Sequence, residues 1–159
     1  MSPHSNRRHD EWGGSLENRA KFAIEVMKEV KRVAQNLGKN DFIIGYRFSP
    51  EELENPGIRI EDTMYLLNQL AKLDPDYMHF SMGTYTRSSI VDQFDPEPLI
   101  TKYLTHRSSE LEQIPVIGVG SILQTKDAQD ALALGYDLLA IGKCSDPLNP
   151  DTDLGGVNE

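Results

Sequence analysis

The sequence predicts an α/β fold built on about four parallel strands. Helical and strand patterns alternate along the chain, the later strand segments are mostly apolar, and each strand segment ends in glycine, serine or proline. Such alternation is typical of strands joined by right-handed helical crossovers, and apolar strands are typical of a sheet covered on both faces. Functional loops are therefore expected at the carboxyl ends of the strands, in a barrel or in an open doubly wound sheet.

Periodicity and capping residues place each element. The first helix is predicted to begin at Leu16, with Ser15 as its N-cap, and to end near Gly38. Three further helices are predicted at residues 59–75, 97–111 and 125–135. Strands are predicted within residues 41–50, 76–83, 114–122 and 136–143.

Length and charge limit the possible functions. The 159 residues suit one domain, residues 1–143, followed by a polar tail at 144–159 that we expect to be poorly ordered. A net charge of -9 disfavours nucleic acid and anionic membranes as partners, because both require a basic surface. No apolar run approaches the roughly 20 residues of a membrane span. The single cysteine, Cys144, cannot form an internal disulfide, so we expect a cytoplasmic protein with an inert thiol.

The main candidate site lies after the third and fourth predicted strands. One strand ends in Gly118 and Gly120, and the next ends in Gly142 and Lys143. Adjacent glycine-rich strand ends can offer backbone N–H groups to a phosphate, with a cation beside them. The other interpretation is that these glycines only permit tight turns and close packing. Both interpretations stay open at this point.

Two polar residues interrupt the apolar strands. Arg47 lies in "IIGYRFSP", where a buried arginine requires either an anionic ligand or a structural ion pair. In "DYMHFSMG", alternation places Tyr77, His79 and Ser81 on one face and the two apolar residues on the other. His79 can be a catalytic residue or a hydrogen-bonded core histidine, and the sequence favours the core. The charged run "NRRHDEW" can bind an anion or a partner, or form a solvated loop.

The segment "SPHSNRRHDEWGGSLENRAKF" resembles the signature that follows the fourth barrel strand in the old yellow enzyme family. The segments "IIGYRFSP", "DYMHFSMG", "IPVIGVGSI" and "LLAIGK" are similar to the fifth to eighth strands of that family. The resemblance implies half of a TIM (β/α)8 barrel, in an NAD(P)H oxidoreductase that uses FMN. The expected fold is thus a parallel (β/α) half-barrel, the C-terminal half of a barrel of about 250 residues.

The resemblance also implies residue roles. Arg47 would contact the pyrimidine end of the flavin, where a cation stabilises reduced flavin. Backbone N–H groups of Gly120, Ser121 and Gly142 would bind the FMN phosphate. Lys143 stands where the family commonly has arginine, so the charge is kept but the bidentate fork is lost. The substrate-orienting and proton-donating residues of the family precede the matching segment, so no catalytic residue or metal ligand is assigned.

Two functions are therefore expected. The chain is either the part of a flavin oxidoreductase that carries the phosphate half-site, inactive by itself, or a half-barrel with only a phosphate-binding or assembly role. An open four-stranded sheet exposes two edges and an apolar face, which predicts self-association through the open barrel edges.

Overall fold

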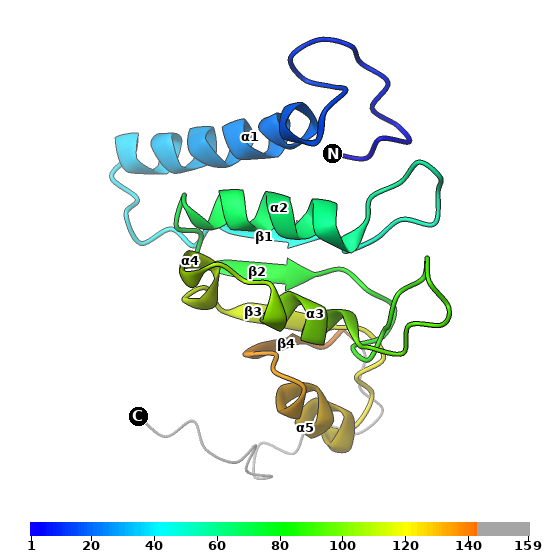
Figure 1. Cartoon of the computed structure of the whole chain (residues 1–159). Coiled ribbons are helices and arrows are strands. Elements are labelled where there is room, and N and C mark those ends of the chain that lie inside the picture. The colour runs from blue at the N-terminus through cyan, green and yellow to red at the C-terminus, as the bar shows by residue number, and fades with distance from the viewer. Residues whose placement is uncertain (143–159) are drawn as a thin grey trace.

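The computed structural model describes residues 1–142 of the chain. Figure 1 shows helices and parallel strands that alternate after a long first helix. The elements are α1 (Leu16–Asn36), β1 (Gly45–Phe48), α2 (Ile60–Ala71), β2 (Tyr77–Phe80), α3 (Leu99–Thr105), α4 (Ser109–Glu112), β3 (Val116–Val119), α5 (Thr125–Ala133) and β4 (Leu138–Ala140). The predicted polar tail at 144–159 lies outside the described residues.

The four strands form one parallel sheet in the order β1-β2-β3-β4. Helices α2, α3 and α4 lie in front of the sheet in Figure 1, and α1 lies beside α2 beyond the β1 edge. This arrangement confirms the predicted parallel (β/α) half-barrel. The expectation of a sheet covered on both faces was wrong for the described residues, because the face opposite the helices remains open.

The core fills the space between the sheet and the helices. Met78 and Phe80 of β2 are fully buried, as alternation along the strand predicts. The Phe80 ring lies 4.5 Å from the Phe48 ring and 5.4 Å from the Tyr103 ring, measured between centroids. Aromatic contacts in tilted or edge-to-face geometry stabilise such a core beyond the area that they bury. They hold β1 and β2 against α3.

Two aspartates fasten the amino ends of neighbouring strands. Asp76 accepts a hydrogen bond from the Ile44 amide at 2.6 Å, and its own amide donates to the Ile44 carbonyl at 2.8 Å. Asp137 repeats both bonds with Val116, at 2.8 and 3.0 Å. Each aspartate thus satisfies backbone groups that the short strands leave unpaired.

Helix α1 begins and ends as predicted. The Ser15 side chain accepts a hydrogen bond from the Asn18 amide, and Gly38 follows the helix with φ +66°. A left-handed residue at this place lets the Lys39 amide bond back to the Ala34 carbonyl, at 2.9 Å. Within residues 1–142 no helix combines the length and apolar character that a bilayer crossing requires.

Helix α1 also carries an exposed apolar stripe. The stripe consists of side chains that are between 42% and 69% exposed, at Phe22, Val26, Val30 and Val33 of the helix and at Leu37 directly after it. Two apolar grooves, of about 320 and 250 Å³, run along this stripe toward Phe42 and the β1 edge. Helix α1 thus presents one apolar surface to the core and a second to solvent.

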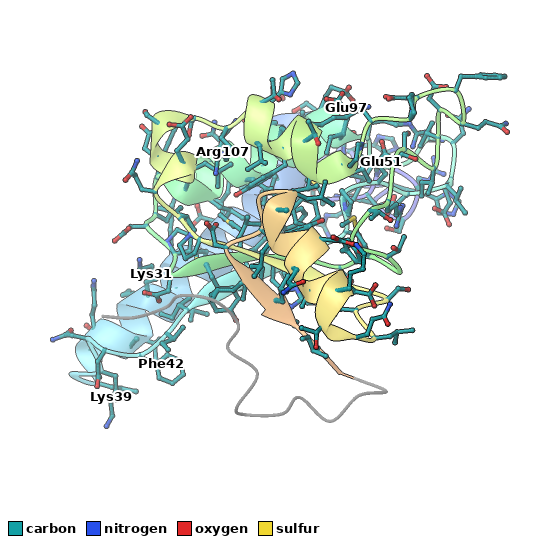
Figure 2. All side chains as sticks on the ribbon, turned by 90° about the horizontal axis from the view of Figure 1, so that it is seen from below. Lys31, Lys39, Phe42, Glu51, Glu97 and Arg107 are labelled. Carbon is teal, nitrogen blue, oxygen red and sulfur yellow. The ribbon has the colours of Figure 1, made fainter. Side chains whose placement is uncertain are left out.

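Two predicted elements differ from the structure. The helix predicted at 97–111 is two helices, α3 and α4, because the Ser108 side chain caps a new helix through the Leu111 amide. The strand predicted within 41–50 begins only at Gly45, and Phe42 and Ile43 are 61% and 71% exposed. Figure 2 shows Phe42 beside Lys39 at the end of the molecule opposite Glu51.

Candidate functional site

The carboxyl ends of the parallel strands meet at one edge of the sheet, on the right in Figure 1. Three strands bring predicted site residues to that edge. Arg47 lies in β1, Gly118 in β3, Gly120 and Ser121 in the turn after β3, and Gly142 shortly after β4. The sixth predicted residue, Lys143, lies outside the described residues.

Arg47 is exposed, so the expectation of a buried arginine was wrong. Alternation in β1 turns Phe48 into the core and leaves Arg47 on the open face of the sheet. Within residues 1–142 the Arg47 guanidinium forms no ion pair, so the alternative of a structural ion pair finds no support there. The side chain is available to an external anion.

The strand register aligns one residue from each strand on this open face. Arg47 pairs with His79, His79 with Ile117, and Ile117 with Leu138. Registered residues of neighbouring parallel strands point to the same face of a sheet. The open face therefore carries a cation and an imidazole at one end of the row and apolar side chains at the other.

His79 is not a hydrogen-bonded core histidine. It is half-buried, and its Nδ1 atom is buried without a hydrogen-bond partner in the part of the chain that the structure describes. Alternation in β2 places His79 with Tyr77, opposite the buried Met78 and Phe80, as predicted. The imidazole thus belongs to the open face and not to the core.

The turn after β3 lies against the loop after β2. The Tyr85 amide donates to the Gly120 carbonyl at 3.0 Å, and the Ser121 hydroxyl donates to the Gly83 carbonyl at 2.9 Å. Gly120 has φ +103°, and a Cβ there would lie 2.6 Å from backbone atoms of Met82 and Gly83. Glycine is therefore required at residue 120 by both conformation and space.

The other two glycines differ from Gly120 in what surrounds them. A Cβ on Gly118 would meet the Tyr136 ring at 2.6 Å, on the helix side of the sheet. Tyr136 is buried there, its hydroxyl donates to the Tyr85 carbonyl at 3.0 Å, and burial raises its pKa. At Gly142, no atom of the described residues 1–142 would lie within 4 Å of an added Cβ. Close packing thus accounts for Gly118, whereas no such packing surrounds Gly142 in the part of the chain that the structure describes.

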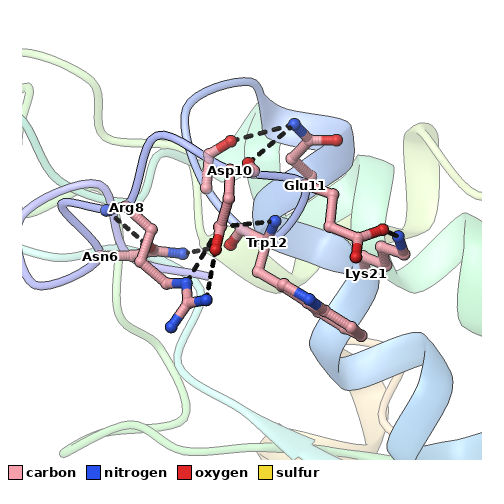
Figure 3. A network of polar contacts seen from close by, with 8 residues as sticks. Asn6, Arg8, Asp10, Glu11, Trp12 and Lys21 are labelled. Carbon is pink, nitrogen blue, oxygen red and sulfur yellow. Dashed lines mark hydrogen bonds and ion pairs between the residues drawn. The ribbon is translucent and has the colours of Figure 1, made fainter.

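The charged run near the N-terminus forms a folded loop, which Figure 3 shows in detail. The Asn6 side chain donates to the Trp12 carbonyl at 2.8 Å, and Arg8 forms an ion pair with Asp10. Lys21 forms an ion pair with Glu11, and its ammonium lies 4.8 Å from the centre of the Trp12 ring. Arg8 and Lys21 thus have partners within the loop, and these contacts stabilise the loop.

Glu51 is a buried carboxylate that the sequence did not reveal as important. It is only 6% exposed and lies in the loop after β1. Both of its oxygens accept from the Ser89 hydroxyl at 3.1 Å, and one accepts from the Ile90 amide at 3.0 Å. Its place directly after the strand-ending Pro50 was the available signal, since carboxyl-end loops carry polar contacts. Glu51 joins the loops after β1 and β2.

A parallel sheet with helices on one face defines a (β/α) half-barrel, and polar residues lie at the carboxyl edge of this sheet. The chain matches the NADH:flavin oxidoreductase / NADH oxidase family over residues 1–147, and it belongs to this family. FMN is the cofactor that the family implies for the longer protein.

Three relatives illustrate the family. The chain is 56% identical over 143 residues to an NADH:acrylate oxidoreductase of Vibrio harveyi and 54% identical over 142 residues to an NADH:fumarate oxidoreductase of Klebsiella pneumoniae. It is 37% identical over 142 residues to a probable NADH-dependent flavin oxidoreductase, YqiG, of Bacillus subtilis. Each match covers 89–90% of this chain but only 14%, 15% and 37% of the relatives. The chain thus corresponds to a part of these longer proteins.

Proposed function

We propose that the chain is the C-terminal half-barrel of an FMN-dependent NAD(P)H oxidoreductase of old yellow enzyme type, and that it carries the half of the flavin site that holds the phosphate. The observation that carries the proposal is the exposed Arg47 side chain on the open face, at the same edge as the Gly120–Ser121 turn. A flavin nucleotide requires both a site for its ring and a site for its phosphate, and this edge offers residues for each.

The ring end of the flavin is assigned to Arg47. By resemblance to the family, its guanidinium would lie beside the pyrimidine ring. A fixed cation there favours the reduced flavin, because reduction places negative charge on that ring. The exposure of Arg47 and its lack of an ion pair within residues 1–142 support this role, since an internal partner would compete with the flavin.

The phosphate end is assigned to Gly120, Ser121 and Gly142, with Lys143 as the neighbouring cation. The tight turn at Gly120 and the lack of packing around Gly142 within residues 1–142 suit close approach of a phosphate to backbone N–H groups. Gly118 is assigned to the same site by the sequence, but its packing against Tyr136 favours a role in holding the turn. Lys143 remains a prediction.

Bound FMN supplies hydride transfer, and the residues of this chain bind and orient it. NADH is the proposed electron donor, because the names of all three relatives contain it. The acrylate and fumarate in two of those names suggest a short unsaturated carboxylate as acceptor for the longer protein. No residue of this chain is assigned as the proton donor, so we expect the chain alone to reduce no alkene.

Titration of the purified chain with FMN tests the proposal. We expect saturable quenching of flavin fluorescence with a shift in visible absorbance, and loss of both in Arg47→Ala. Arg32→Ala is the matched control, because Arg32 is an exposed arginine of α1 that pairs with Glu29. Flavin binding that is absent from the unaltered chain, or equal in the two variants, would refute this function.

A second candidate function is assembly with another copy of the chain. Eight parallel strands close a (β/α) barrel, and this chain supplies four with both outer edges unpaired within residues 1–142. The exposed α1 stripe lies next to the free β1 edge, where a further strand and helix would pack. We propose that two copies associate with β1 of each beside β4 of the other, which buries both edges.

A further inference from the structure

We propose that His79 is a second hydrogen-bond donor to the flavin, beside Arg47. This inference rests on the proposed flavin site and assigns it an additional residue. His79 would donate from Nε2 to a carbonyl oxygen or ring nitrogen of the flavin pyrimidine.

The position of His79 matches that of Arg47. The two residues are registered partners in β1 and β2, and each is the third residue of its strand. Neighbouring strands lie about 4.8 Å apart, so the two side chains leave the open face next to each other. A planar ligand placed over Arg47 therefore also lies within reach of His79.

The surroundings of the ring determine which nitrogen can donate. Nδ1 is buried and has no partner within residues 1–142. Nε2 is neither hydrogen-bonded there nor among the buried atoms without a partner, so it reaches the surface on the open side. In the neutral ring the proton belongs on Nε2, because an N–H at Nδ1 would be buried without an acceptor. His79 thus presents one N–H to the open face.

The acceptors of the flavin suit such a pair of donors. The pyrimidine ring of an oxidised flavin carries an unprotonated ring nitrogen directly beside a carbonyl oxygen, along one edge. A guanidinium and a neighbouring imidazole N–H can bind adjacent acceptors of that edge at the same time. Arg47 supplies the charge, and His79 supplies a second donor that fixes the orientation of the ring.

A matched pair of variants separates the two ring nitrogens. The side-chain nitrogen of glutamine in His79→Gln can occupy the place of Nε2, whereas that of asparagine in His79→Asn reaches only the place of Nδ1. We expect the Kd for FMN to stay within about threefold in His79→Gln and to rise about tenfold in His79→Asn, which corresponds to about 1.4 kcal/mol. Circular dichroism of both variants verifies that they are folded.

The outcomes are distinct. Equal affinity of the unaltered chain and both variants would overturn the role of His79 and leave the proposed flavin site intact. An equal loss of FMN affinity in both variants would show that the shape of the ring matters and not its Nε2 atom. That result would also overturn the role of His79 as a donor. No FMN binding by the unaltered chain would overturn the proposed function together with this inference.

Nuclear magnetic resonance of the unaltered chain gives an independent test that needs no variant. The ¹⁵N shifts of the His79 ring report which nitrogen carries the proton. We expect the Nε2–H tautomer in the free chain and a further change at Nε2 when FMN is added. A proton on Nδ1, or an Nε2 signal that FMN leaves unchanged while binding occurs, would refute the proposed donor.

Discussion

At Gly120, the backbone conformation directly determines the shape of the proposed phosphate site. Its φ of +103° and the carbonyl of Met82, 2.6 Å from a built Cβ, leave no room for a side chain. The Tyr85 amide is bonded to the Gly120 carbonyl, so movement of this turn would also disturb the loop after β2. A substitution here is therefore expected to affect both stability and phosphate binding.

Gly120→Ala should lower the free energy of unfolding by about 2 kcal/mol or more, since strained backbone and steric overlap add. Urea denaturation at fixed protein concentration measures the change. Gly83→Ala is the matched control, because Gly83 has open space around a built Cβ, and its effect should stay within about 0.5 kcal/mol. Equal effects of the two substitutions would contradict the constraint at Gly120.

For single residues, the sequence predicted the face to which a side chain points better than it predicted how exposed that side chain is. Alternation placed Met78 and His79 on opposite faces correctly, since it depends only on the geometry of a strand. The burial of Arg47 was predicted wrongly, because the exposure of a face depends on what covers it. The importance of Glu51 could not be predicted, since its partners Ser89 and Ile90 are distant in sequence.

At the scale of elements, the start of α5 illustrates how a carboxylate stabilises a helix end. The Asp127 side chain accepts from the Leu123 amide at 2.9 Å and from the Gln124 amide at 3.1 Å. The hydrogen bond from the Leu123 amide is the largest cause that lowers the pKa of Asp127. Helix α5 follows the Gly120–Ser121 turn, so its first residues support the candidate phosphate site.

The lowered pKa of Asp127 predicts a pH-dependent contribution to stability. A carboxyl with a depressed pKa in the folded state stabilises the fold above its unfolded pKa, roughly 3.9, and loses that effect as the pH falls through the folded value. Asp127→Asn should therefore lower the free energy of unfolding near neutral pH and match the unaltered chain at strongly acidic pH.

Urea denaturation across this pH range measures the effect of Asp127→Asn. Asp41→Asn is the control, because Asp41 is exposed and forms no hydrogen bond within residues 1–142. A difference between Asp127→Asn and the unaltered chain that persists unchanged in acid would contradict the electrostatic explanation.

The elements themselves were largely predictable, because helix caps and strand patterns are local. Ser15 and Gly38 bounded α1 as expected. The division of residues 97–111 into α3 and α4 was not predicted. The break depends on the Ser108 amide donating to the side chain of Asn68, which lies in α2. Such a contact is visible only once the helices are packed together.

At the scale of the whole molecule, the open edges and the α1 stripe predict self-association. We expect light scattering coupled to size-exclusion chromatography to give the mass of a dimer. Val30→Glu should shift the mass toward the monomer, because it places a charge within the exposed apolar stripe. Arg32→Gln is the matched control, since it changes the net charge equally on the same helix outside both grooves.

The mass of a monomer at all protein concentrations, or equal dissociation of Val30→Glu and Arg32→Gln, would refute the proposed assembly.

The sequence predicted the half-barrel as a whole, because three strand–helix units with a fourth strand and the family segments agree with each other. The open face was less predictable, since nearly continuous apolar strands are typical of sheets covered on both sides.

The repeated aspartates mark two pairs of strands that are built alike. Asp76 ties β1 to β2 and Asp137 ties β3 to β4, each at the amino ends of the strands. Between the two pairs, the Met78 amide donates to the Pro115 carbonyl at 2.9 Å, and the Gly120–Ser121 turn is bonded to the loop after β2. The two pairs are thus alike in construction and joined at both ends of the sheet, which is the pattern that duplication of one two-strand unit would leave.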